Sequence, residues 1–184
     1  MAETLVSDRL VLRPWTLDDA DEAFEIYGRH EVARWLSPAM GPVPDVGAMG
    51  MVLHHWIVED ERAVAPTGRW AIELQEQKRV IGGVALLYLP PGGEDLEISW
   101  HLAPDVWGHG YASEAGHAVA HEALQHHHVE EVFGVVRPEN ERAAATAQRI
   151  GMEWAGETEK YYGQLLQVYR LRAADLDHPM PGQR

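Results

Sequence analysis

The stretch between residues 96 and 126 constrains the fold of this chain most, because it joins a strand pattern to a helix pattern through glycines. Residues 96–102, LEISWHL, alternate strictly between apolar and polar or ionisable positions, as in a half-buried strand. The polar face carries Glu97, Ser99 and His101. From Tyr111 to about His126 the apolar residues recur at helical spacing. A tight glycine loop, WGHG, must therefore connect a strand to an amphipathic helix.

The remaining periodicities predict a mixed α/β domain. The expected order is strand, helices, three strands, helix, strand, helix and two strands. We expect strands at 9–14, 69–74, 80–89, 96–102, 131–137, 152–157 and 164–171. We expect helices at 17–30, 31–36, 45–62, 111–126 and 140–150, with Asp45 as an N-terminal cap and Gly151 as a C-terminal stop. Residues 4–172 form the predicted domain, and 173–184 a short C-terminal tail.

Length and charge describe an ordinary globular protein with an acidic surface. The chain has 184 residues, of which 46% are hydrophobic and 24% charged, enough for one sizeable core. The formal net charge of -14 argues against sequence-independent nucleic-acid binding, which needs a basic face. The charge fits basic substrates such as amines or cationic peptide ends, and it equally fits carboxylates that only keep the surface soluble.

The sequence also lacks the features of several classes of protein and of site. There is no cysteine, so disulfides, thiolate metal sites and a cysteine nucleophile are impossible. The first ten residues, MAETLVSDRL, carry charge early and do not read as a signal peptide. No apolar run approaches the ~18 residues of a membrane helix. We therefore expect a cytoplasmic protein without membrane association.

The glycines before the helix are candidates for an anion site. A helix N-terminus presents free N–H groups and a partial positive charge, and glycines let a ligand approach the backbone closely. The alternative is a turn in which the glycines serve geometry alone. Two other nucleotide motifs do not fit: a Rossmann fingerprint would need glycine where Ser113 stands, and a P-loop would end in G-K-[ST].

The neighbouring segments resemble one family. TLVSDRLVLRPWTLDDADEAFEIY, LEISWHLAPDVWGHGYASEA and VRPENERAAATAQRIGM follow one another along the chain. Together they resemble the GCN5-related N-acetyltransferases (GNAT), particularly the RimJ/RimL-type branch that acetylates ribosomal-protein N-termini, over roughly residues 4–171. The resemblance implies a single domain with a mixed, mostly antiparallel sheet of about seven strands. It also implies a splayed parallel strand pair at the cofactor site and about four to five flanking helices.

The same resemblance implies where acetyl-CoA binds. In this family the amides of a Q/R-x-x-G-x-G/A loop hold the pyrophosphate, and here Trp107 replaces the first residue. The backbone near Leu102 is expected to pair with pantetheine, and Asn140 matches an asparagine that contacts it. The implied acetyl-CoA residues are Leu102, Gly108, His109, Gly110, Tyr111, Ala112, Ser113 and Asn140.

Acetyl transfer to an amine needs a neutral amine and a proton for the departing thiolate. At pH 7, deprotonation costs roughly 4 to 5 kcal/mol for a lysine-like amine and roughly 1 kcal/mol for an α-amine. Glu97 stands where the family often has a glutamate and is the candidate base, with Ser99 and His101 beside it as a water relay. Two alternatives are a structural or substrate-orienting role for Glu97, and His101 as the base.

A phenol is the candidate acid. The family often places a tyrosine after the helix that ends near Gly151, and Tyr161 falls there, with Tyr162 adjacent. A phenol of pKa ~10 can protonate a thiolate, although tyrosines near strands also serve as packing residues. Ala143 stands where some relatives place a serine, which removes that proton donor.

Histidines and tryptophans raise two further questions. His117 and His121 are four residues apart, but no H-E-x-x-H motif is completed. The histidines at 126–128 suit a helix C-terminus without any metal, so we expect no metal site. Trp35 and Trp56, in the helices before the first long strand, are candidates for lining an acceptor cleft.

The sequence thus predicts an N-acetyltransferase that moves the acetyl group of acetyl-CoA to a primary amine by direct attack, without a covalent enzyme intermediate. The resemblance favours a protein N-terminal α-amine. A small-molecule amine such as an antibiotic or polyamine, a lysine side chain, a succinyl donor and a homodimer stay open. A non-catalytic CoA-binding regulatory domain is the alternative class; Ala143 supports it, and Glu97 and Tyr161 oppose it.

Overall fold

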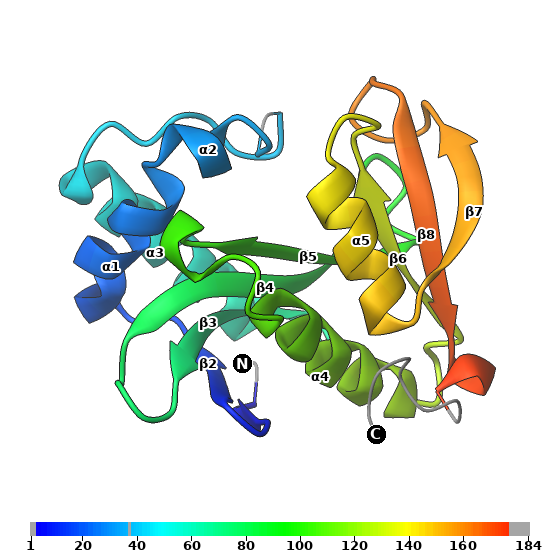
Figure 1. Cartoon of the computed structure of the whole chain (residues 1–184), viewed down its shortest axis with the longest axis horizontal. Coiled ribbons are helices and arrows are strands. Elements are labelled where there is room, and N and C mark those ends of the chain that lie inside the picture. Colours follow the sequence, from blue (N-terminus) through cyan, green and yellow to red (C-terminus); the bar gives the residue numbers. More distant parts are fainter. Residues whose placement is uncertain (1–2, 37, 177–184) are drawn as a thin grey trace.

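The chain folds around a mixed sheet with the strand order β1-β2-β3-β4-β5-β6-β8-β7 (Figure 1). The computed structural model describes residues 3–36 and 38–176. The strands are β1 Leu5–Val6, β2 Leu10–Pro14, β3 Gly68–Leu74, β4 Val80–Tyr88, β5 Leu96–Leu102, β6 Glu131–Val136, β7 Glu153–Thr158 and β8 Leu166–Arg172. The helices are α1 Ala20–Tyr27, α2 His30–Ala33, α3 Val46–Arg62, α4 Tyr111–Gln125 and α5 Glu141–Ile150.

The sheet is antiparallel except between β5 and β6. These two strands run parallel, and their register is a single pair, Glu97 opposite Phe133. In Figure 1 the β6–β8–β7 group stands at a steep angle to β5. The predicted mostly antiparallel sheet with a splayed parallel pair is therefore confirmed. Within the described residues the sheet has eight strands, because the two-residue strand β1 pairs with β2.

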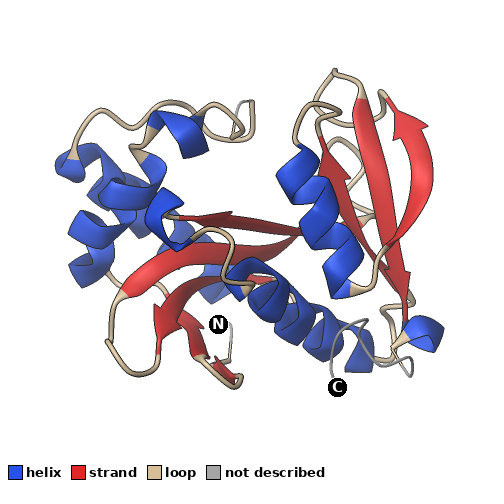
Figure 2. Ribbon diagram, in the orientation of Figure 1, coloured by secondary structure: helices blue, strands red, loops and turns tan. Residues whose placement is uncertain are grey.

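Helices cover both faces of the sheet. Neighbouring residues of a strand point to opposite faces, and on β5 the ring of His101 contacts Tyr27 of α1. Trp100, the preceding residue, faces α4, where a Cβ added at Gly116 would lie 3.7 Å from its ring. Thus α1 and α4 pack on opposite faces. Figure 2 shows the N-terminal helices gathered at one side of the molecule and α5 lying along the β6–β8–β7 group.

Two predicted helix boundaries are confirmed. The Asp45 carboxylate accepts a hydrogen bond from the Ala48 N–H at 2.8 Å and caps α3. Gly151 adopts a φ of 103° and ends α5, a left-handed conformation that favours glycine. On α3, Met49 and Leu53 are fully buried and face the core.

Two predicted helices are shorter than expected. The helix expected from Leu17 begins as a 3-10 turn and becomes α-helical at Ala20, because the Asp19 carboxylate accepts hydrogen bonds from the Thr16 N–H and hydroxyl. The segment expected at 31–36 is α-helical at His30–Ala33 and continues in turns closed by i to i−3 bonds.

The C-terminal part of the chain leaves the sheet after β8. Within the predicted tail 173–184, Ala173–Asp175 form a 3-10 turn, and residues 177–184 lie outside the described part of the structure. Among the helices that the structure describes, none is long and apolar enough to cross a bilayer.

Candidate active site

A cleft of about 310 Å³ lies over the face of β4 and β5 that α1 also covers. Its floor is a double row of cross-strand pairs: Leu87 with Glu97, Ala85 with Ser99, and Gly83 with His101. The β5 row is the polar face that the alternation of LEISWHL predicts. The β4 row becomes smaller toward Gly83, at the His101 end.

Glu97 sits in this cleft beside the point where β5 and β6 diverge. Burial raises the pKa of its carboxyl to about 7, and a hydrogen bond from the Val135 backbone offsets part of that rise. Near neutral pH the group is therefore divided between its two protonation states, which suits a proton acceptor. The predicted base candidate thus faces the cleft.

His101 lies at the other end of the floor in an apolar setting. Burial lowers the pKa of its imidazole to about 4, so the ring is neutral at physiological pH. It lies two positions along β5 from Ser99 and four positions from Glu97. Because a strand rises about 3.3 Å per residue, His101 lies about 13 Å along β5 from Glu97.

The two adjacent tyrosines point to different places. Tyr162 lines the cleft, and burial together with the nearby Glu97 charge raises its pKa to about 12. Its φ of 55° is left-handed, a conformation rare for aromatic residues. Tyr161 does not line the cleft; its hydroxyl donates to Asp95 at 2.6 Å, and its ring is buried in a cluster with Leu89 and Leu166. The structure brings Tyr162 into the cleft with Glu97.

Aromatic side chains wall the His101 end of the cleft. The rings of Trp15, Tyr27 and Trp56 contact one another with centroids 5.4 to 6.3 Å apart. The Tyr27 ring also contacts His101, at 5.8 Å. We call these four residues the aromatic wall. Trp35 and Trp56, the predicted acceptor-side tryptophans, both line the cleft.

Sequence reasoning missed Trp15 and Tyr27, although a signal was present. Gly82 and Gly83 lie inside the strand pattern of β4, and a glycine within a strand often marks a close approach. A Cβ added at Gly83 would collide with the Tyr27 hydroxyl and would lie 3.0 Å from the Trp15 ring. Gly83 therefore creates the space into which the aromatic wall projects.

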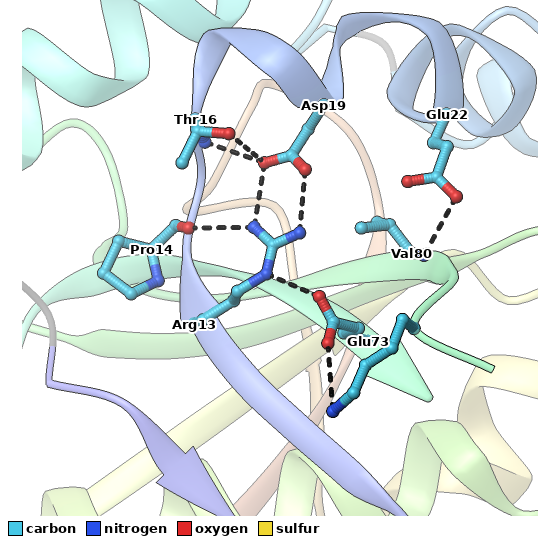
Figure 3. A network of polar contacts seen from close by, with 8 residues as sticks. Arg13, Pro14, Thr16, Asp19, Glu22, Glu73 and Val80 are labelled. Carbon is cyan, nitrogen blue, oxygen red and sulfur yellow. Dashed lines mark hydrogen bonds and ion pairs between the residues drawn. The ribbon is translucent and has the colours of Figure 1, made fainter. Parts of the chain in front are cut away.

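A polar network holds the chain that carries Trp15 (Figure 3). Arg13 binds both carboxylate oxygens of Asp19, at 2.8 and 2.9 Å, and its Nε donates to Glu73 at 2.8 Å. Burial alone would raise the pKa of Asp19, but the bonds from Arg13 and Thr16 hold it below its usual value. The network ties the end of β2 to the start of α1 and so fixes Trp15 between them.

A second ion-pair group holds Trp56. Arg69 of β3 bonds to Asp60 at 2.6 Å and to Glu59 at 2.8 Å, and both carboxylates belong to α3. The Arg69 guanidinium also lies 5.9 Å from the Trp56 ring centroid. These bonds pin α3 against the sheet, and they balance the charge of an arginine that lines the cleft.

The predicted pyrophosphate loop lies at the N-terminus of α4. Gly108 and Gly110 adopt φ of 83° and 81°, so both positions need glycine. Gly110 is the N-terminal cap, and no side chain caps the helix. A Cβ at Gly108 would meet no atom within 4 Å. Open space and uncapped amides at a helix N-terminus fit a pyrophosphate group.

An arginine from the N-terminal hairpin clamps this loop. Arg9 pairs with Glu114 of α4 at 2.7 Å and donates to the His109 carbonyl at 3.0 Å. Its guanidinium lies 4.4 Å from the Tyr111 ring centroid, and the His109 and Tyr111 rings stack at 5.7 Å. Ala112 and the buried Ser113 pack inward at the start of α4.

The other two residues predicted to contact pantetheine, Leu102 and Asn140, form hydrogen bonds within the protein. The Leu102 carbonyl accepts a hydrogen bond from the Trp107 indole at 2.9 Å, and Arg142 lies over that indole at 4.5 Å. The Asn140 side chain caps α5 through the Ala143 N–H at 3.2 Å and lines the cleft. The slot between the diverging strands β5 and β6 thus has Asn140 on its β6 side.

The histidines of α4 contact one another and a neighbouring amide. His117 and His121 stack at 6.3 Å, and Gln125 hydrogen-bonds to His121 at 2.8 Å. Among the described residues, no group of three His, Cys, Asp or Glu side chains is placed to hold a metal ion.

Comparison with known proteins agrees with this geometry. Residues 9–153 match the model of the acetyltransferase (GNAT) domain. The chain is 26% identical over 170 residues to the uncharacterized N-acetyltransferase p20 of Bacillus licheniformis, covering 91% of this chain and 93% of that protein. It is 24% identical to the uncharacterized N-acetyltransferase YoaA of Bacillus subtilis, covering 89% and 90%.

Solved structures share the fold. RimL, a ribosomal alpha-N-protein acetyltransferase in complex with coenzyme A, superposes with a TM-score of 0.75 at 17% identity and covers 95% of this chain and 100% of its own. The self-immunity acetyltransferase MccE, in complex with acetyl-CoA and AMP, gives a TM-score of 0.74 at 15% identity, covering 90% and 93%. The present chain belongs to the GNAT acetyltransferases, in their RimJ/RimL-like branch. It is an N-acetyltransferase.

Proposed function

We propose that this enzyme transfers the acetyl group of acetyl-CoA directly to the α-amine of a protein or peptide N-terminus. The observation that carries the proposal is the placement of Glu97. Its carboxyl group, with a pKa of about 7, lies in a cleft at the point where β5 and β6 diverge. Two similar structures, RimL and MccE, are complexes with coenzyme A or acetyl-CoA.

In this proposal the donor substrate runs from the α4 N-terminus to the cleft. The amides after Gly108 and Gly110 hold the pyrophosphate, and Arg9 keeps the loop in place through Glu114. Asn140 and the β5 backbone near Leu102 flank the pantetheine arm. Holding both substrates in one slot supplies the orientation that accounts for most of the rate enhancement in such a reaction.

Two side chains of the cleft, Glu97 and Tyr162, then accept and donate protons in the reaction. Glu97 takes a proton from the incoming ammonium, directly or through a water near Ser99, and leaves the amine free to attack. As the nitrogen bonds to the acetyl carbon and the carbon–sulfur bond breaks, Tyr162, a neutral phenol at physiological pH, donates a proton to the leaving thiolate. The second proton lost by the new amide nitrogen restores the phenol. Neither step needs a covalent bond to the enzyme, and the cleft supplies both groups within one cavity.

The choice of an α-amine rests on its acidity and on a relative. An α-amine of pKa ~7.8 gives up its proton far more readily than a lysine amine of pKa ~10.4, so a base of pKa about 7 is matched to it. RimL, which shares this fold, is a ribosomal alpha-N-protein acetyltransferase.

Thiol release from acetyl-CoA tests the proposal. Short peptides with a free N-terminus should release coenzyme A, and the same peptides with a blocked N-terminus should not. Coenzyme A should also raise the melting temperature, because a ligand that binds the folded state stabilises it. A folded protein that shows neither thiol release with any amine nor a thermal shift would overturn the proposal.

A further inference from the structure

The guanidinium of Arg142 lies beside the glycine loop, although it comes from a different part of the chain. Arg142 stands in the first turn of α5, and its guanidinium carbon lies 4.5 Å from the centroid of the Trp107 ring. Trp107 directly precedes Gly108, and its indole N–H donates to the Leu102 carbonyl at 2.9 Å. The indole is therefore fixed at the start of the loop, and it holds a cation there by a cation–π contact.

The positive charge of Arg142 is not neutralised by a carboxylate in the described part of the chain. Glu139 and Glu141, its neighbours in sequence, form no ion pair with it there, and none of its guanidinium N–H groups donates to a described residue. Arg9, by contrast, is already paired with Glu114. A cation–π contact uses none of the N–H donors of a guanidinium, so those of Arg142 can still bind an anion.

The electrostatic setting of Arg142 favours a bound anion. The N-terminus of a helix carries a partial positive charge, so a cation in the first turn, as here, is disfavoured until an anion lies beside it. The formal net charge of the chain is -14, so a ligand with several phosphate groups is repelled at long range and needs positive groups close to it. A guanidinium suits a phosphate because its planar N–H groups can bind two oxygens at once.

Building on the proposed function, we propose that Arg142 binds the pyrophosphate group of acetyl-CoA together with the main-chain amides of residues 108–113. None of these N–H groups donates to an acceptor within the described residues. Trp107 positions the guanidinium, and the guanidinium supplies the full positive charge that the amides lack. Because α5 follows β6 and the loop follows β5, the bound pyrophosphate also links the two sides of the slot between these strands.

Calorimetric titration of coenzyme A tests this inference and needs no acceptor. Arg142→Gln should weaken the binding of coenzyme A about three- to tenfold, because it removes a charge-assisted contact at an exposed position. Arg149→Gln is the matched control: Arg149 is also exposed and lies in the last turn of the same helix, about 10 Å further along its axis. The control loses the same charge and should keep its affinity for coenzyme A.

Dephospho-coenzyme A distinguishes the phosphate groups of the donor, because it keeps the pyrophosphate and lacks the 3′-phosphate. Arg142→Gln should weaken its binding as much as that of coenzyme A. The affinity of the wild type for coenzyme A should also fall more steeply with added salt than that of Arg142→Gln, because salt screens the charge that the variant lacks. With an acceptor that reacts, the KM for acetyl-CoA should rise in Arg142→Gln while kcat stays unchanged.

Three results would overturn the inference while leaving the proposed function intact. Equal affinities of Arg142→Gln and Arg149→Gln for coenzyme A would show that Arg142 has no particular role. A loss confined to coenzyme A would assign Arg142 to the 3′-phosphate, and a loss that is the same at every salt concentration would assign it to packing on Trp107. Failure of the wild type both to bind coenzyme A and to release thiol overturns the proposed function itself.

Discussion

The two ends of the candidate active site are built in different ways. The loop at residues 108–113 is contiguous, and its open surface is backbone: two left-handed glycines before the uncapped N-terminus of α4. The aromatic wall is assembled from four separate segments through the side chains of Trp15, Tyr27, Trp56 and His101. Recognition through backbone leaves glycines at fixed spacing in a sequence, whereas a wall of side chains leaves no local pattern. A site made of backbone can therefore be predicted from a local stretch of sequence, and a site made of distant side chains cannot.

Glu97 belongs neither to the glycine loop nor to the aromatic wall, and its substitution should cause the largest loss of activity. Glu97→Gln keeps the shape and removes the basic carboxylate, so kcat should fall by roughly 10²- to 10⁴-fold near pH 7 while acetyl-CoA affinity stays unchanged. In the wild type, activity should rise as the pH passes through about 7, because the carboxyl must lose its proton before it can accept another. The variant should lack this step, and its deficit should shrink at high pH, where the amine is already neutral.

A pH-rate series with one peptide acceptor measures this directly. A loss below about threefold at every pH would remove Glu97 as the base. A large loss that is constant across pH would instead assign Glu97 to holding the acceptor.

The next largest effect should come from Gly110→Val, which tests whether the loop binds acetyl-CoA through its backbone amides. Gly110→Val places a branched residue at a φ of 81°, so the amides should shift and acetyl-CoA affinity should fall at least tenfold. Gly93→Val is the matched control, because Gly93 has a φ of 67° and no atom within 4 Å of an added Cβ. Both variants should lose thermal stability. Equal acetyl-CoA affinities in a calorimetric titration would show that the loop is merely a turn.

A smaller loss of activity should distinguish the roles of the two adjacent tyrosines, Tyr161 and Tyr162. Tyr162→Phe should lower kcat about tenfold, which is below the usual range of general acid-base effects, because that phenol lines the cleft. Tyr161→Phe should leave kcat unchanged and destabilise the fold by about 0.5 to 1.5 kcal/mol through loss of its bond to Asp95. Steady-state kinetics and thermal melts of both variants separate the roles. The opposite pattern would assign the proton to Tyr161.

The smallest effect concerns the clamp on the loop. Arg9→Gln removes the ion pair with Glu114, and because the Arg9 side chain is 47% exposed, acetyl-CoA affinity should fall only about two- to fivefold. Arg172→Gln removes an ion pair with Asp175 at the end of β8, where the Arg172 side chain is also 47% exposed, and it should leave that affinity unchanged. Matching losses in the two variants would mean that the clamp contributes only general stability.

Much of the fold followed from periodicity and caps. The alternation of LEISWHL placed Glu97, Ser99 and His101 on one face, and the Asp45 cap and Gly151 stop marked two helix ends. The pattern could not reveal β1, because two residues are too short for a periodic signal. The resemblance pointed to Tyr161, whereas the tyrosine that lines the cleft is Tyr162, whose left-handed backbone no local pattern predicts; which of the two donates a proton stays a prediction.

The sequence by itself determined the family, the order of the longer elements, the glycine loop and the polar row of β5, because each depends on neighbours close along the chain. Only the tertiary structure decided the aromatic wall, the diverging strand pair and the environment of Glu97. Trp15 and Tyr27 meet His101 because Gly83 leaves room for them and because Arg13 and Asp19 fix the turn between β2 and α1. The pKa of Glu97 moves to about 7 through burial. Burial is a property of everything packed around a residue, and no local stretch of sequence specifies it.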